Sequence, residues 1–177
     1  MHRLFVAIRP PRPVRERLLA AMGGVAGARW QSEDQLHLTL RVIGEVDGRQ
    51  AADIDAALAA IRTPPFDVAI AGIGNFERRR EATALWAGVT PQEPLRTLHK
   101  KVDQALVRSG LEPERRAYVP HITLARLPRG GGPVGGFLAG AGGDAGAPFR
   151  IDEFRLYESH LTADGARYAV LERYPLA

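Results

Sequence analysis

The feature of this 177-residue chain that most constrains its fold is an order of elements that occurs twice. In each half a short apolar strand is followed by a helical stretch and then by a strand that opens with His-x-Thr. The spacing agrees, because 32 positions separate Phe5 from His37 and 35 separate Trp86 from His121. A repeat of this kind predicts two related lobes that pack together. The alternative is a chance similarity of two strand-helix-strand units.

Local patterns predict an α+β fold with three helices and seven strands. The first helix has Pro13 in its opening turn and ends near Gly23-Gly24, while Asp47 and Thr90 read as caps of the second and third helices. The third helix is expected to end near Ser109-Gly110. Short apolar or alternating runs predict strands at residues 3–8, 36–43, 66–73, 83–89, 118–126, 149–158 and 167–174.

The length predicts one domain rather than several. Apolar residues make up 45% of the chain and charged residues 25%, as in folded globular proteins. We expect a single domain over residues 1–177, built from two interleaved halves at roughly 1–75 and 83–158, with a C-terminal strand at 167–174.

The composition excludes several kinds of chemistry and location. The chain has no cysteine, so disulfides, thiolate nucleophiles and Cys-based zinc sites are excluded. It has no run of about 18 apolar residues and no signal peptide pattern, which predicts a cytoplasmic protein without membrane contact. The net charge of +4 is compatible with an anionic partner such as nucleic acid, or with a genome that favours Arg codons.

The two His-x-Thr motifs are the candidate active site. Residues i and i+2 of a strand point to the same face, so His37 shares a face with Thr39, and His121 shares one with Thr123. The apolar residues between them supply the buried face. If the two halves pack about a pseudo-twofold axis, both pairs converge on one cleft.

Two imidazoles beside a phosphate suit an in-line displacement. One takes a proton from water while the other gives a proton to the leaving ribose oxygen, and a pKa of about 6.5 makes both states accessible near neutral pH. The threonine hydroxyls can donate to the non-bridging oxygens as charge builds on them. Neither motif carries adjacent carboxylates, so we expect no metal and no cofactor, with a His-only metal pair as the alternative.

The remaining histidines are expected to be bystanders. His160 also begins a His-x-Thr pattern, but it lies outside the repeat and runs into a turn at Ala163-Asp164-Gly165. His99 falls within the third predicted helix beside two lysines, which favours a surface role, and His2 is close to the terminus.

Two further segments have a plain and a functional interpretation. Residues 130–146 are rich in glycine and read as a mobile loop, because the Gly-Lys-Ser/Thr of a phosphate-binding loop is missing. Residues 77–81, Glu-Arg-Arg-Arg-Glu, read as a solvated hairpin loop, with a basic lip of the cleft as the alternative.

These residues together resemble a known family, the 2H phosphoesterases, and within it the bacterial RNA 2′,3′-cyclic phosphodiesterases, also described as 2′-5′ RNA ligases. The resemblance spans the whole chain. It rests on Arg3-Leu4-Phe5-Val6-Ala7-Ile8, His37-Leu38-Thr39-Leu40-Arg41-Val42-Ile43-Gly44, Pro120-His121-Ile122-Thr123-Leu124-Ala125-Arg126, Tyr157-Glu158-Ser159 and Gly165-Ala166-Arg167-Tyr168. It implies a bilobal pseudo-twofold repeat of two antiparallel sheets flanked by helices, with a central cleft.

The resemblance also implies an activity. A member of this family is expected to hydrolyse 2′,3′-cyclic phosphate ends of RNA or nucleotides to 2′-phosphomonoesters, with His37 as proton donor and His121 as acceptor. The same chemistry in reverse would join such an end to a 5′-hydroxyl without ATP. We expect a monomer. The alternatives are an RNA- or nucleotide-binding module of the same fold with little catalysis, and a basic scaffold in which the repeats are only structural.

Two arginines are candidates for further phosphate contacts. Arg126 follows the second motif as in similar family members, but strand alternation places it on the face opposite His121 unless a bulge intervenes. Arg41 has the parity of the first motif, although an exposed surface role would explain it too. Trp30, Phe5 and Phe76 are able to stack a base, and core packing is the alternative for each.

Overall fold

The computed structural model describes residues 1–140 and 146–177. Its strands are β1 (His2–Ile8), β2 (Arg29–Trp30), β3 (Leu38–Val46), β4 (Phe66–Arg78), β5 (Glu81–Thr90), β6 (His121–Arg126), β7 (Phe149–Ile151), β8 (Glu153–Thr162) and β9 (Gly165–Pro175). Its helices are α1 (Arg12–Ala21), α2 (Gly48–Ala59), α3 (Glu93–Arg108) and α4 (Gly135–Gly140), with a 3-10 turn η1 (Glu33–Gln35).

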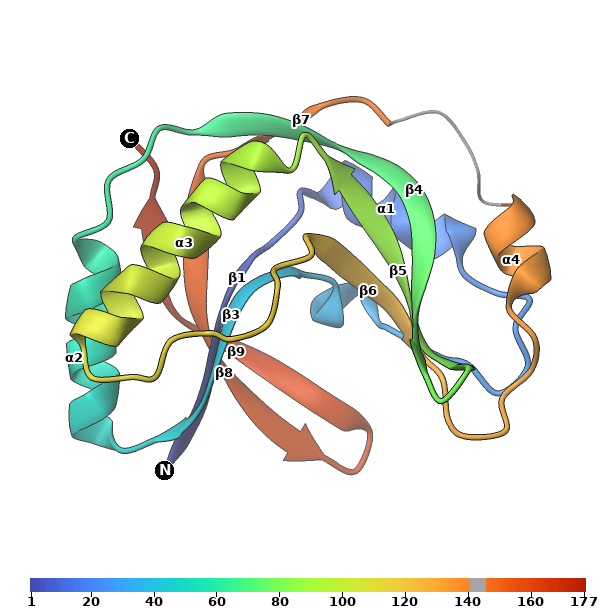
Figure 1. Ribbon diagram of the computed structural model, residues 1–177, viewed down its shortest axis with the longest axis horizontal. Coiled ribbons are helices and arrows are strands. Elements are labelled where there is room, and N and C mark those ends of the chain that lie inside the picture. The colour runs from blue at the N-terminus through green and yellow to red at the C-terminus, as the bar shows by residue number, and fades with distance from the viewer. Residues whose placement is uncertain (141–145) are drawn as a thin grey trace.

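The strands form one curled antiparallel sheet, which confirms the α+β fold class (Figure 1). The order is β7-β4-β5-β6-β3-β1-β8-β9, with β2 beside β6. The two related antiparallel sheets that were expected are the halves of this sheet, and a single residue pair, Leu38 opposite Ile122, joins them at the centre. The two motif strands β3 and β6 therefore meet in the middle of the molecule.

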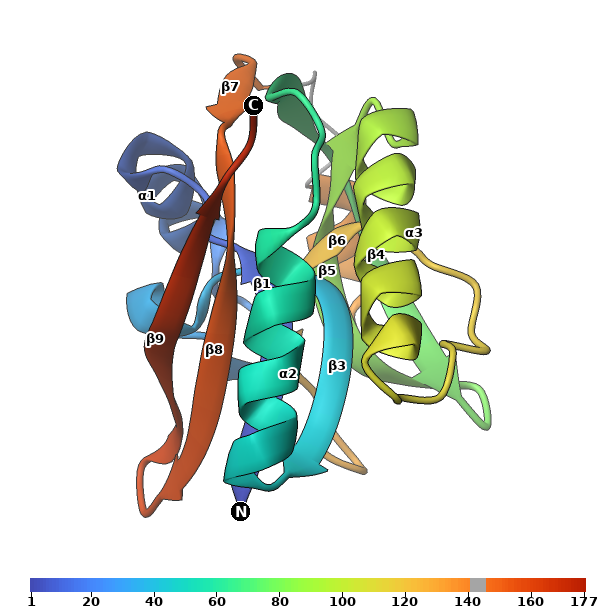
Figure 2. The same ribbon diagram turned by 90° about the vertical axis from the view of Figure 1, so that its left-hand side faces the viewer.

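Helices α2 and α3 lie side by side on one face of this sheet (Figure 2). The buried residues of α3 recur at helical spacing and belong to the main core: Leu95, Leu98, Val102, Ala105 and Leu106. Helix α2 begins where predicted, because the Asp47 carboxylate accepts from the Gln50 backbone N–H at 2.8 Å and the Gln50 side chain accepts from the Asp47 N–H at 3.0 Å. The buried side chains Ile54 and Leu58 of α2 belong to the main core and hold the helix against α3 and the sheet.

Three predicted boundaries are wrong for identifiable reasons. Thr90 is not a helix cap, because it continues β5 opposite Ala69, and α3 begins at Glu93. The strand predicted at residues 118–126 begins only at His121, since the preceding Pro120 has no backbone N–H for a ladder. The strand predicted at 149–158 is two strands, of which β7 pairs with β4 and β8 pairs with β1.

The glycine-rich segment is more ordered than its composition predicts. Residues 135–140 form α4, and its Phe137 ring lies 5.4 Å from the Trp30 ring. Leu138 packs in the same small cluster with buried Leu85 and Ala125. These apolar contacts outweigh the low helix propensity of the glycines. The rest of the predicted loop includes residues 141–145, which lie outside the described residues.

No helix in the described ranges 1–140 and 146–177 is long and apolar enough to cross a membrane.

Candidate active site

The central strand pair brings the two motifs together. Leu38 of β3 lies opposite Ile122 of β6, and each directly follows its motif histidine. Continuing this antiparallel register by one residue each way sets His37 opposite Thr123 and Thr39 opposite His121. Residues opposite each other on neighbouring strands have Cβ atoms about 5 Å apart. Each imidazole thus faces the hydroxyl of the other motif.

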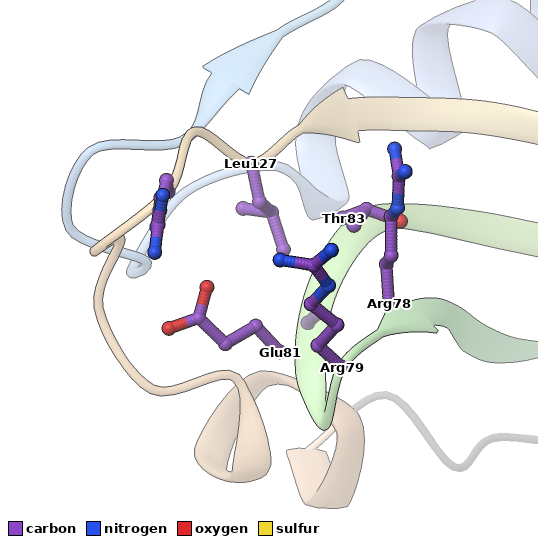
Figure 3. A pocket seen from close by; sticks show the side chains of 7 residues that line it. Arg78, Arg79, Glu81, Thr83 and Leu127 are labelled. Atoms are coloured by element: carbon purple, nitrogen blue, oxygen red, sulfur yellow. The ribbon is translucent and has the colours of Figure 1, made fainter.

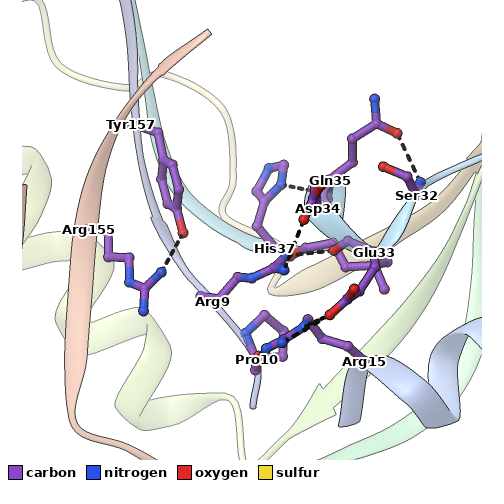
Figure 4. Close-up of polar contacts among 11 residues, drawn as sticks. Arg9, Pro10, Arg15, Ser32, Glu33, Asp34, Gln35, His37, Arg155 and Tyr157 are labelled. Atoms are coloured by element: carbon purple, nitrogen blue, oxygen red, sulfur yellow. Dashed lines mark hydrogen bonds and ion pairs between the residues drawn. The ribbon is translucent and has the colours of Figure 1, made fainter. Parts of the chain in front are cut away.

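Both imidazoles are oriented by the same kind of hydrogen bond. His37 Nδ1 lies 2.6 Å from the Gln35 carbonyl oxygen, and His121 Nδ1 lies 2.6 Å from the Val119 carbonyl oxygen (Figure 4 shows the first). A carbonyl oxygen only accepts, so Nδ1 carries the proton in both rings. In the neutral imidazole Nε2 is then the basic nitrogen, and it is the one available to chemistry.

Aromatic rings surround each imidazole. The His37 ring lies 5.0 Å from Phe5 and meets Tyr168 edge-on at 5.3 Å, and the His121 ring meets Phe76 edge-on at 4.9 Å. Removal of water by this packing lowers the pKa of His37 to about 4, and it also lowers the pKa of His121. The positive charge of Arg126 lowers the pKa of both rings further, so both are mainly neutral at pH 7.

A bulge in β3 reverses the expected side of Arg41. Ala7 of β1 lies opposite Thr39 and Val6 lies opposite Arg41, so Leu40 is an extra residue in β3. An extra residue changes which face the following side chains occupy. The prediction that Arg41 shares a face with the first motif is therefore wrong. The exposed Val42 stands where unbroken alternation would have placed Arg41.

The Arg41 guanidinium is buried and donates from all three of its nitrogens. Only 8% of the residue is exposed, and Nε donates to Asp103 Oδ1 of α3 at 2.9 Å. Its other nitrogens donate to the carbonyl oxygens of Val42 and Glu112. This ion pair lowers the pKa of Asp103 against the opposing effect of its burial. Arg41 is thus part of the cleft wall, and its side chain connects β3 to α3.

A bulge at the equivalent point of β6 moves Arg126 to the face of the second motif. Neighbouring residues of β5 lie opposite Thr123 and Ala125, so Leu124 is the extra residue. The bulge in β3 moves the Arg41 side chain to the face opposite His37. The bulge in β6 has the same effect on strand alternation, and it moves the Arg126 side chain to the face of His121. The bulge that the sequence required for this arginine is present.

The predicted site residues line a single cleft with a volume of about 490 Å³. His37, Thr39, Arg41, His121, Thr123 and Arg126 all belong to its wall, together with Gln31, Phe76, His99 and the loop residues Glu114, Arg116, Ala117, Tyr118 and Val119. Within residues 1–140 and 146–177, no group of three or more His, Cys, Asp or Glu side chains is arranged to hold a metal ion.

His99 was predicted to lie on the surface, and the structure places it in the wall of the cleft. Its ring stacks on Tyr118 at 4.1 Å, and its Nδ1 donates to the Leu40 carbonyl oxygen at 2.7 Å. The Tyr118 hydroxyl donates to the Thr39 carbonyl oxygen at 3.0 Å. This pair thus holds the bulged segment of β3. The signal was helical spacing, since position 99 is four residues after buried Leu95.

Of the three aromatic residues predicted to stack a base, only Phe76 lies in the cleft wall. Phe5 is buried and stacks on Tyr157 at 5.1 Å, whereas Phe76 is 36% exposed at the cleft and Trp30 packs on α4. His160 is not among the residues of the cleft wall, and its Nε2 lies 3.3 Å from Glu158 Oε1.

Comparison with known proteins identifies the family. Residues 10–162 match the model of the 2'-5' RNA ligase superfamily, and the chain belongs to it. An RNA 2',3'-cyclic phosphodiesterase of Escherichia coli (strain K12) is 30% identical over 98% of this chain and 96% of its own length. One of Geobacillus stearothermophilus is 30% identical over 83% of this chain, which spans 47% of that longer relative.

A solved structure shares the architecture. The crystal structure of E. coli LigT complexed with 3'-AMP is 28% identical and superposes with a TM-score of 0.81 over 99% of this chain and 98% of LigT. The family assignment made from the two motifs is confirmed.

Proposed function

We propose that this chain is a metal-independent RNA 2′,3′-cyclic phosphodiesterase with His37 and His121 as its acid and base. The observation that carries the proposal is the pair of imidazoles at the centre of the sheet, each with Nδ1 held by a backbone carbonyl and Nε2 left for proton transfer. The phosphodiesterase activity named for relatives at 30% identity supports it.

In the proposed reaction, water attacks the phosphorus of the cyclic phosphate. One imidazole accepts the water proton at Nε2 while the other donates its Nε2 proton to the 3′-oxygen, whose bond to phosphorus breaks. The product is a 2′-phosphomonoester with a free 3′-hydroxyl. The family's role assignment makes His37 the donor and His121 the acceptor. A 5′-hydroxyl that attacks in place of water would break the same bond to the 3′-oxygen and give a 2′-5′ linkage without ATP.

In the proposed mechanism, binding of the phosphate anion favours protonation of one imidazole. Both rings are mainly neutral at pH 7 by themselves, whereas the donor must be cationic. A phosphate anion between them raises the pKa of each ring, because an opposite charge favours the protonated form. Thr39, Thr123 and Arg126 supply donors to the non-bridging oxygens as their charge grows. We assign Arg41 to the support of β3 instead.

We also propose that residues 1–75 and 83–158 are two interleaved halves of one domain, as their order of elements suggests. Each half has its bulge at the residue after the motif threonine, Leu40 or Leu124. The halves interleave because β4 pairs with β5 and β8 pairs with β1.

The test is turnover of 2′,3′-cyclic nucleotides by three histidine variants, with EDTA present and the products identified. His37→Ala and His121→Ala should each lower turnover by about 10²-fold or more, and the 2′-phosphomonoester should be the product. His160→Ala is the matched control and should retain activity. Near-full turnover by either cleft variant refutes the mechanism. Nucleotide binding by the wild-type protein without turnover of any cyclic phosphate would favour the binding module instead.

A further inference from the structure

A second cavity lies outside the catalytic cleft, at the tip of the β4–β5 hairpin. It has a volume of about 500 Å³ and is lined by the side chains of three arginines (Figure 3 labels two of them). Its wall consists of Arg78, Arg79, Arg129, Glu81, Ala82, Thr83 and Leu127, and we call it the arginine pocket. Nothing in the proposed reaction at the two imidazoles uses these residues.

The charge of the arginine pocket favours an anion. The wall holds three guanidinium groups and a single carboxylate, that of Glu81, so the pocket has an excess of positive charge. Within residues 1–140 and 146–177, none of these three arginines forms an ion pair. Arg78, Arg79 and Arg129 are all exposed, so their donors are open to a ligand from solvent. Guanidinium groups match the geometry of phosphate oxygens.

The turn of the β4–β5 hairpin contains two residues in a backbone conformation that side chains disfavour. Arg79 and Arg80 occupy the two turn positions with φ of 53° and 67°. A two-residue turn with positive φ at both positions normally selects Asn-Gly or similar pairs, because a side chain is strained there. Strain of this kind that persists in a fold points to a functional demand on the residue. Of these two turn residues, Arg79 lines the arginine pocket.

The same hairpin connects the arginine pocket to the catalytic cleft. Phe76 lies in the cleft wall and meets the His121 ring edge-on, and Arg78 is two residues further along the same strand face. Two residues of a strand cover about 7 Å. Arg126 ends the neighbouring strand β6 and belongs to the cleft, whereas Arg129, in the turn after β6, belongs to the arginine pocket. An anion in the arginine pocket is therefore separate from the reacting phosphate but within reach of the same extended ligand.

We propose that the arginine pocket binds a backbone phosphate of the RNA strand that carries the cyclic end. The inference rests on the proposed function for the identity of that strand. It makes the enzyme prefer short oligonucleotides over mononucleotides, because only an oligonucleotide places one phosphate between the imidazoles and another at the hairpin. Binding by phosphate contacts is independent of sequence and weakens with salt.

The test compares two triple variants that lose the same charge. R78A/R79A/R129A removes the pocket, and R49A/R108A/R173A removes three exposed arginines elsewhere on the chain. The first measurement is kcat/KM for a 2′,3′-cyclic mononucleotide and for a five-nucleotide RNA with the same end. The pocket variant should lose about 10-fold or more on the RNA, mainly through KM, and stay within about 2-fold on the mononucleotide. The control should keep the wild-type ratio of the two substrates.

The second measurement is binding of a five-nucleotide RNA with a 3′-phosphate, by fluorescence anisotropy across a salt series. Loss of this one phosphate contact should reduce the slope of log Kd against log salt by about 0.7. Equal losses on both substrates, equal losses in the control variant, or unchanged RNA binding would each overturn the proposal. If the wild-type protein turns over no cyclic phosphate, the proposed function fails and this binding series still decides the arginine pocket.

Discussion

The low pKa of His37 predicts that the protein loses stability in mild acid. Packing against Phe5 and Tyr168 lowers this pKa to about 4, whereas an unfolded chain has the ordinary value of about 6.5. Above pH 6.5 the ring is neutral in both states and contributes no pH dependence. Below pH 6.5 the imidazole of His37 binds a proton in the unfolded chain but stays neutral in the folded protein. The free energy of unfolding therefore falls as the pH drops from about 6.5 to about 4.

The size of this effect follows from the two pKa values. Each pKa unit is worth about 1.4 kcal/mol, so His37 should cost the fold about 2 kcal/mol at pH 5 and about 3 kcal/mol near pH 4. Urea unfolding at pH 8 and pH 5 measures it. In His37→Gln the loss of stability between the two pH values should be smaller than in the wild type by about 2 kcal/mol. His160→Gln is the control, because it removes an imidazole outside the cleft. An identical loss in the wild type and in His37→Gln would refute the reasoning.

Three further predictions concern activity. Because the pKa of each imidazole is lowered, the bell-shaped profile of kcat/KM should have its maximum below pH 6.5. The kcat profile should lie at higher pH, because bound phosphate raises both pKa values. A kcat/KM maximum above pH 7 would contradict the lowering of these pKa values. Arg126→Ala should lower kcat/KM by about 10²-fold and move the remaining profile toward higher pH, since a positive charge near both rings is lost; a loss without this movement would mean that Arg126 acts elsewhere. Gly74→Ala should destabilise the fold by about 1–3 kcal/mol and reduce activity, because a Cβ there would lie 2.3 Å from the Trp86 ring beside His121; full stability in urea would show that the ring moves freely.

Local sequence determined the three longer helices, most of the strands and the candidate pair His37 and His121. Strand alternation and helical spacing act over a few residues, so the buried face of β6, with Ile122 between His121 and Thr123, follows from sequence alone. The cap at Asp47 is equally local, because its partner Gln50 is three residues away. The equivalence of the two motifs also required no three-dimensional information.

Only the tertiary structure decided which other side chains reach the cleft. A bulge adds one residue to a strand and reverses all later faces, and the residues at Leu40 and Leu124 carry no distinctive mark of it. The same local rule therefore placed Arg41 and Arg126 on the wrong faces. Helical spacing places His99 beside the buried face of α3, but only the packing of α3 against β3 brings it to the cleft. The sequence by itself determined the pair of histidines, and the packing of distant strands and helices determined their surroundings, because those contacts join residues far apart in the chain.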